Sequence, residues 1–306
     1  MEQPTQDSLF VSMPGGAQLH LRRIQAEGAT RCPVLMLHGS IENGRVFYTD
    51  SGRGLGPFLA RAGHPVYVAD QRGRGQSRPR LARGHGYGQT ESITEDLPAL
   101  HQAVAAHHPG QPVHWVAHSW GGVLMLVALG RFPALRTEVA SLSFFGTKRC
   151  VRVNNLHKRL LIDLYWMRLA RLAALAFGYL PSKRLGLGSD DESRASLAQC
   201  CAWVRPGPWI DPADGFDYGS ALTLAEHLPP AWYLAAVNDP CLGHPDDVRD
   251  LMTEAGQANQ RFTLLGRSQG NMHDYDHVTM LTHRDSPQDH FSAVATWLAE
   301  HNDSGE

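Results

Sequence analysis

A serine between small neighbours gives the sharpest chemical signal in this sequence. Ser119 lies in the segment AHSWGG (117–122), between a short apolar run and a helical pattern. A serine held on a tight strand-to-helix turn projects its hydroxyl outward, and the strained turn needs small residues two positions before and after it. Ala117 and Gly121 meet that need. The pattern predicts that Ser119 is a nucleophile.

An attacking serine also needs N–H donors that stabilise the developing oxyanion. One candidate is the backbone N–H of Trp120, at the start of the predicted helix. The other is the backbone N–H of Ser40, because His38-Gly39-Ser40 follows directly after the apolar run Val34–Leu37. We therefore expect Ser40 and Trp120 to form an oxyanion hole.

A carboxylate should follow the serine along the chain, at the end of another strand. Asp239 comes just after the predicted strand 232–237. The competing acids fit structural roles: Asp246 and Asp247 suit the N-terminus of the next helix, and Asp70 precedes the serine. We expect Asp239 to orient the histidine, and Asp70 to anchor the turn that follows it.

The histidine is chosen from several in the region before the last helix. His277 precedes the short apolar run Val278–Leu281, which could hold its ring still, whereas His273 follows a polar stretch. His290 lies within the pattern of the final helix. We predict His277 as general base, with Nε2 near Ser119 Oγ and Nδ1 near Asp239, and His273 as the next choice.

Neither metal nor organic cofactor is expected. His273 and His277 are four residues apart, but the residues between them match no zinc motif. The loop Arg72–Gly75 follows a strand without matching a phosphate-binding glycine pattern. The odd number of cysteines lacks a repeated spacing and suggests reduced, mostly buried thiols: Cys32, Cys150, Cys200, Cys201 and Cys241.

Composition narrows the choice of partners. Hydrophobic residues make up 42% of the 306 residues and the formal net charge is −2, so nothing favours nucleic acid or an anionic membrane surface. The first ten residues lack the apolar run of a secretory signal, and charges interrupt the most apolar region, 160–180. These features predict a cytoplasmic protein without stable membrane insertion; its oligomeric state is left open.

The elements that would position these residues alternate along the chain. A hairpin is expected at 9–22, followed by alternating strands and helices up to 145 and again from 231. Ser92 and Glu95 resemble a capping box for a helix over 92–107. The predicted strands are 34–37, 65–69, 113–117, 139–145, 231–237 and 261–265, and the other predicted helices are 55–62, 121–131, 246–255 and 288–300. A mostly parallel sheet with helices on both faces follows.

The alternation breaks in the middle of the chain, where helical patterns dominate. We therefore predict a core domain of residues 1–147 and 229–306, and a helical cap insertion of residues 148–228 over the carboxyl ends of the strands. An apolar stripe in the cap runs from Leu160 to Leu175. It could pack on its neighbours or serve as an acyl-binding lid, and the two are compatible. In the second case Leu161, Leu164 or Leu172 should line a pocket beside Ser119.

Several blocks of the chain resemble those of α/β-hydrolase-fold enzymes. They are residues 37–40 (LHGS), 70–77 (DQRGRGQS) and 117–122 (AHSWGG). Residues 275–281 (YDHVTML) resemble the histidine block of the lipase and esterase branch, which often has an aspartate where Thr279 stands. Residues 177–181 and 184–188 resemble a bacterial subgroup of predicted hydrolases. The resemblance implies the α/β-hydrolase fold and a Ser-His-Asp triad.

Together these features predict a serine hydrolase that cleaves a small-molecule carboxylic ester, with an apolar acyl chain, through an acyl-enzyme. The same triad could serve an acyltransferase, a thioesterase or an aminopeptidase. A non-catalytic binding protein on a hydrolase scaffold is a further alternative, against which the order of serine, acid and histidine counts.

Overall fold

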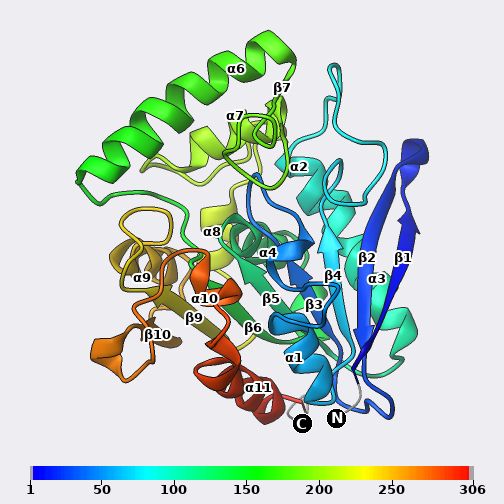
Figure 1. Cartoon of the computed structure of the whole chain (residues 1–306). Helices are drawn as coiled ribbons and strands as arrows, with labels where there is room; N and C mark the ends of the chain where they lie inside the picture. Colours follow the sequence, from blue (N-terminus) through cyan, green and yellow to red (C-terminus); the bar gives the residue numbers. More distant parts are fainter. Residues whose placement is uncertain (1–2, 303–306) are drawn as a thin grey trace.

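Eight strands form one sheet within residues 3–302, the part of the chain that the computed structural model describes (Figure 1). Their order is β1-β2-β4-β3-β5-β6-β9-β10. β1 and β2 form an antiparallel hairpin whose second strand pairs antiparallel with β4, and all other pairings are parallel. The strands are β1 (Thr5–Ser12), β2 (Gln18–Gln25), β3 (Val34–Leu37), β4 (Val66–Asp70), β5 (Val113–His118), β6 (Val139–Phe145), β9 (Ala231–Ala236) and β10 (Arg261–Leu265).

Helices cover both faces because the central strands present apolar side chains to both sides. Every residue of β3 is buried. Val34 and Met36 share a core with α1 (Leu55–Arg61) and α11 (Phe291–Glu300). Leu35 and Leu37 point the other way, into a core with α3 (Leu97–His107), α4 (Trp120–Arg131) and α9 (Pro245–Glu254). The mostly parallel, helix-covered sheet predicted from the sequence is confirmed.

The predicted strands agree closely with the observed ones, and β3, β6 and β10 have the predicted bounds. The capping-box prediction is wrong. The helix begins earlier, with α2 (Gln89–Glu91), and continues through η3 (Ser92–Asp96) into α3. Glu91 Oε2 accepts the Gly88 N–H at 2.5 Å, while Glu95 pairs with Arg72. Ser92 already has helical backbone angles, so it cannot be the residue that caps the helix.

Between β6 and β9 lies a segment rich in helices, seen at the top of Figure 1. It contains η4 (Lys158–Leu169), which continues into α6 (Ala170–Phe177), and α7 (Arg194–Trp203). The short strands β7 (Tyr179–Leu180) and β8 (Glu192–Ser193) pair with each other. α8 (Tyr218–Thr223) lies nearer the core, beside α4 in Figure 1. This helix-rich segment lies between the end of β6 at Phe145 and the start of β9 at Ala231, and the division into a core and a cap at 148–228 stays a prediction.

The apolar stripe of η4 and α6 does not pack as a buried face. Its leucines are exposed, from 43% at Leu161 to 62% at Leu172. Met167, which also belongs to the stripe, is buried as expected, and the helix otherwise packs through Ile162, Ala170 and Ala174. Small alanines let neighbouring helices approach closely, so the larger leucines are left outside the contact. The expectation that the leucine stripe packs on its neighbours is wrong for most of its members.

Other expectations concern the whole chain. All five cysteines are buried, as predicted. No helix within residues 3–302 is long and apolar enough to cross a membrane. The ends of the predicted core domain, residues 1–2 and 303–306, lie outside the described residues.

Candidate active site

Ser119 stands on a strained turn between β5 and α4. Its φ of 52° and ψ of −123° lie in a region that residues other than glycine rarely adopt. The turn also brings α4 against the end of β3, where a Cβ on Gly121 would lie 2.5 Å from the His38 carbonyl oxygen. Only glycine fits there, which accounts for the small residue two positions after the serine. Ala117, two positions before it, is fully buried in β5 without strain in its backbone.

Three side chains from distant parts of the chain form a line of hydrogen bonds. Ser119 Oγ lies 2.9 Å from His277 Nε2, and the hydroxyl is the donor when this nitrogen is unprotonated. His277 Nδ1 donates to Asp239 Oδ2 at 2.6 Å. Because Nδ1 of the neutral ring carries the proton that bonds to Asp239, Nε2 is left unprotonated and accepts from the serine. The structure thus has the distances expected from the sequence for Ser119, His277 and Asp239.

The Asp239 carboxylate is held from its far side as well. It follows β9 and is 1% exposed. Its other oxygen, Oδ1, accepts the backbone N–H of Leu242 at 2.8 Å. Burial alone would raise the pKa of Asp239, but the charge and hydrogen bond of His277, with backbone donors, outweigh it and hold that pKa at about 2. A carboxylate that stays ionised can stabilise an imidazolium beside it.

Two backbone N–H groups are available beside the serine. Trp120 is the first residue of α4, where helical N–H groups lack acceptors within the helix. Ser40 lies in the loop after β3, and its N–H has no backbone or side-chain acceptor among residues 3–302. The two loops approach closely, since a Cβ on Gly39 would lie 2.9 Å from Ser119 Cβ. Ser40 and Trp120 also line the same pocket as Ser119.

The rejected histidines lie elsewhere. His273 Nε2 forms a hydrogen bond of 2.8 Å with Asp285 Oδ2. The ring centroids of His273 and His283 lie 4.2 Å apart. These three residues hold potential metal-ligand atoms within 4.8 Å of one another, but none of them lines the pocket beside Ser119. His290 directly precedes α11 and donates from Nε2 to the Met280 carbonyl oxygen.

The rejected acids also have structural positions. Asp70 Oδ2 accepts the Gln76 N–H at 2.8 Å in the turn that follows β4, as expected for an anchor. Asp246 and Asp247 lie in the first turn of α9, again as expected. None of the three lines the pocket beside Ser119. The structure therefore brings Asp239 alone of the four acids to His277.

A buried ion pair behind the serine was not foreseen from the sequence. His118 Nδ1 lies 2.8 Å from Glu42 Oε2, and His118 Nε2 lies 2.8 Å from the backbone carbonyl oxygen of His277. When Glu42 is ionised, both neighbours only accept hydrogen bonds, so both ring nitrogens donate and His118 is an imidazolium. Burial works against this charge, but Glu42 outweighs it and raises the pKa of His118.

The same pair keeps its carboxylate ionised. Burial would raise the pKa of Glu42, but His118 holds it at about 2. Glu42 Oε2 also accepts the Gly39 N–H at 2.9 Å. The pair therefore ties the loop after β3 to the backbone of His277. The position of His118 next to Ser119 was the one available signal in the sequence.

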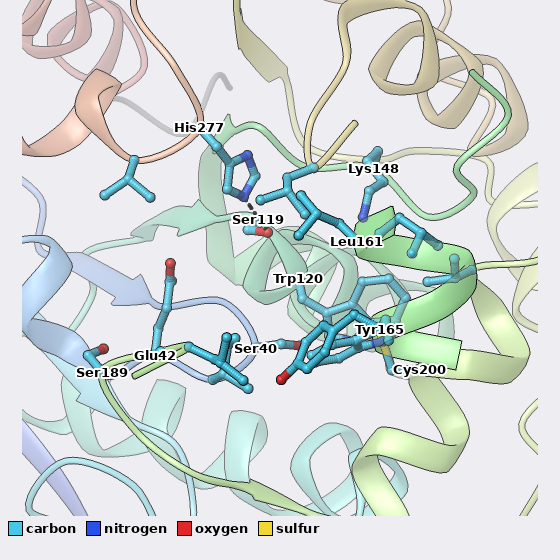
Figure 2. A pocket seen from close by; sticks show the side chains of 18 residues that line it. Ser40, Glu42, Ser119, Trp120, Lys148, Leu161, Tyr165, Ser189, Cys200 and His277 are labelled. Carbon is cyan, nitrogen blue, oxygen red and sulfur yellow. Dashed lines mark hydrogen bonds between the residues drawn. The ribbon is translucent and has the colours of Figure 1, made fainter. Parts of the chain in front are cut away.

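A cavity of about 450 Å³ opens beside the serine (Figure 2). The sheet edge contributes Ser119, Trp120 and His277, and the helical segment contributes mostly apolar side chains. Leu161 lines it, as expected for at least one of the three leucines named, whereas Leu164 and Leu172 do not. The remaining lining residues are Ser40, Ile41, Glu42, Lys148, Ile162, Tyr165, Trp166, Leu187, Gly188, Ser189, Cys200, Val204, Leu242 and Val278.

Comparisons with known proteins point to one fold. Residues 33–168 match the family model described as alpha/beta hydrolase fold. No curated protein matches this chain in sequence. The match covers β3 to η4 and so includes the loop of Ser40 and the turn of Ser119, but it ends before Asp239 and His277.

Solved structures resemble the chain along nearly its whole length. A putative aryl esterase from Burkholderia cenocepacia is 14% identical, with a TM-score of 0.58 over 96% of this chain and 99% of the other. A haloalkane dehalogenase from Bradyrhizobium elkani is 17% identical, with a TM-score of 0.64 over 97% and 98%. A thioesterase domain from the curacin biosynthetic pathway is 15% identical, with a TM-score of 0.56 over 97% and 99%. At these identities the likeness concerns the fold.

Proposed function

Because this chain has the α/β-hydrolase fold, we propose that it is a serine hydrolase that cleaves carboxylic esters of small molecules. A fold hosts many activities, so the proposal rests on the site. The observation that carries it is the continuous line from Ser119 Oγ through His277 to the buried Asp239, with bonds of 2.9 and 2.6 Å. In this proposal Ser119 is the nucleophile, His277 the general base and Asp239 the acid that orients it.

The reaction begins with proton transfer from Ser119 Oγ to His277 Nε2 as Oγ attacks the ester carbonyl carbon. The carbonyl electron pair moves to oxygen, and the N–H groups of Ser40 and Trp120 stabilise that oxyanion. When the tetrahedral intermediate collapses, the C–O bond to the alcohol breaks and His277 protonates the leaving oxygen. Water, deprotonated by His277, then attacks the acyl carbon. The bond from that carbon to Ser119 Oγ breaks, His277 returns the proton to Oγ, and the carboxylic acid is released.

The ion pair behind the site supports this role for His277. The imidazolium of His118 donates to the backbone carbonyl of His277, and Glu42 fixes His118 in turn. A general base must keep its ring in line with both serine and acid. His118 and Glu42 are therefore positioning residues in this proposal, acting on the backbone that carries the base.

The pocket supports an ester with an apolar part of modest size. Cavities of about 300–1,000 Å³ hold small organic ligands, and this one has about 450 Å³. Leu161, Ile162 and Trp166 give it an apolar wall opposite the sheet edge. Ester hydrolysis suits this site because the acyl group can lie against that wall while the carbonyl faces Ser119.

The test compares the wild type with Ser119→Ala on a panel of p-nitrophenyl esters of increasing chain length. We expect hydrolysis to fall by roughly 10⁴-fold or more in the variant, because the nucleophile is lost while Ser119 contributes little to packing. Circular dichroism and thermal unfolding check that the fold is kept. Product analysis with added alcohols and thiols separates hydrolysis from acyl transfer. Near-wild-type turnover by a folded Ser119→Ala protein would refute the proposal.

A further inference from the structure

A lysine in the pocket forms no ion pair with any residue between 3 and 302. Lys148 follows β6 by three residues, lines the cavity beside Ser119 and is only 7% exposed. Of the described residues that line this cavity, it is the one lysine or arginine. Figure 2 shows its side chain extending into the pocket near Leu161 and Trp120, on the opposite side of Ser119 from Glu42. A cationic side chain therefore lies where a substrate would bind.

Within the described residues, this amine lies near an aromatic ring but near no group that pairs with its charge. Among residues 3–302, Lys148 Nζ has no hydrogen-bond partner. No carboxylate oxygen in this part of the chain lies within 4.0 Å of it, the distance needed for an ion pair. The Lys148 ammonium group lies over the Trp120 ring, with Nζ 5.6 Å from the ring centroid. A charge this buried is costly unless it is paired, and a distant aromatic face supplies only part of the compensation.

Two carboxylates are the candidates for an internal partner of Lys148. Glu42, across the pocket, is paired with His118 at 2.8 Å. Asp247, which does not line the pocket, accepts the Arg152 N–H through Oδ1 at 2.8 Å. Its Oδ2 is buried without a hydrogen-bond partner. Burial raises the pKa of Asp247, and the positive charge of Lys148 offsets part of that increase. Among the described residues, Asp247 is therefore the carboxylate that a structural role for Lys148 would involve, although no ion pair joins the two.

We propose that Lys148 binds a carboxylate carried by the substrate, so that the preferred substrates are esters of a small molecule with a second, anionic group. This proposal rests on the proposed function and adds the substrate class. Because Glu42 and His118 neutralise each other, Lys148 leaves the pocket with an excess positive charge. A carboxylate at Nζ would form a charge-assisted hydrogen bond in a largely apolar setting.

The carboxylate could lie on the acyl part or on the alcohol part of the ester. Two matched pairs of substrates distinguish them. Mono(p-nitrophenyl) adipate is compared with p-nitrophenyl hexanoate, and 4-carboxyphenyl butyrate with phenyl butyrate. The wild type should prefer the anionic member of one pair by kcat/KM. A wild type that prefers the neutral member of both pairs would overturn the proposal while leaving ester hydrolysis intact.

Substitutions assign that preference to Lys148. Lys148→Met keeps the length and removes the charge, and should lower kcat/KM for the preferred anionic ester by about 10- to 100-fold, since a hydrogen bond to a charged group is lost. The loss on the neutral ester should be smaller, so the ratio of kcat/KM for the anionic ester to that for the neutral ester should fall by about tenfold or more. Lys148→Arg should recover part of the anionic preference. Equal losses on both esters in Lys148→Met would indicate a structural role toward Asp247 and overturn the proposal.

A binding measurement keeps this test separate from that of the triad and does not depend on how Lys148→Met folds. The Ser119→Ala protein, which should not turn over ester, is titrated with adipate and with neutral 1,6-hexanediol by calorimetry. We expect adipate to bind at least about tenfold more tightly than the diol, and the double variant with Lys148→Arg to keep most of that difference. Equal binding of both compounds would refute the role of Lys148 even if Ser119 proves to be the nucleophile.

Discussion

The sheet edge and the helical segment above it satisfy their polar groups in different ways. At the edge, Ser119, His277 and Asp239 are joined by hydrogen bonds, and Leu242 closes the far end through its backbone. In the segment that follows β6, Lys148 has no ionic partner among residues 3–302, and the Tyr165 hydroxyl is buried without a hydrogen bond. Both of these side chains line the pocket.

The difference separates two tasks. Groups whose positions must be reproducible for chemistry are fixed by bonds within the protein, because small displacements of reacting atoms cost large factors in rate. Groups that face the ligand can leave their partners open until it binds. We therefore expect substitutions at the sheet edge to lower turnover of all substrates. Substitutions in the helical segment should change the choice among them.

The largest difference in kcat is expected between alanine variants of His277 and His273, two histidines of one loop. His277→Ala should lower kcat by roughly 10⁴-fold or more, because the base is lost. His273→Ala is the matched control: it removes a bond to Asp285 outside the pocket, and kcat should stay within a few fold. Steady-state kinetics on one good ester measure both. A large loss in His273→Ala with a small one in His277→Ala would reverse the assignment of the base.

The next effect concerns Asp239, whose pKa falls from the ordinary 3.8 to about 2 in the folded protein. Asp239→Asn should lower kcat by up to about 10⁴-fold, because asparagine favours the wrong histidine tautomer. Between the two pKa values the unfolded chain binds more protons than the folded one, so stability falls as pH falls through this window. Asp239 should contribute about 2 kcal/mol above pH ~4, and this should be lost near pH ~2.

Urea unfolding at several pH values checks this contribution. The curve of unfolding free energy against pH should be flatter below pH ~4 in Asp239→Asn than in the wild type. Ser119→Ala, which keeps the Asp239–His277 pair, is the control and should follow the slope of the wild type. Parallel curves for wild type and Asp239→Asn would show that the pair does not lower this pKa.

The smallest effect is expected in the helical segment. Leu161→Ala should change the dependence of kcat/KM on acyl chain length by about two- to tenfold, since it removes apolar surface from the pocket wall. Leu172→Ala changes the same residue type at 62% exposure, outside the pocket, and should leave that dependence unaltered. Small ratios of kcat/KM between two esters are measured by letting esters of different acyl chain length compete in one reaction. Equal profiles for Leu161→Ala and the wild type would remove Leu161 from the acyl site.

Much of the sheet edge can be predicted from sequence because its signals are local. The small residues around Ser119 are demanded by the turn itself, and Asp239 and His277 each follow a recognisable strand. The pair of Glu42 and His118 could not be predicted, since only the close approach of two loops brings these side chains together. Lys148 was overlooked because a lone lysine after a strand carries no pattern.

The helical segment was harder for a different reason. Its leucines suggest a buried stripe, yet the residues of α6 that are buried are the smaller Ala170 and Ala174. Hydrophobic spacing indicates a helix but does not determine which side faces the protein when apolar residues surround it. Leu161 reaches the pocket while Leu172 remains exposed, and only the position of the helix above the sheet decides between them.

The role of Ser119 is tested most directly by covalent labelling followed by peptide mass spectrometry. A fluorophosphonate loses fluoride when an activated serine oxygen attacks phosphorus, and it leaves a stable adduct on that residue. We predict one adduct on Ser119 in the wild type, no adduct in Ser119→Ala and much slower labelling in His277→Ala. In the wild type, ester hydrolysis should fall in proportion to the fraction of Ser119 that is labelled. Labelling of a different serine, or full ester hydrolysis by a protein already labelled at Ser119, would contradict the account.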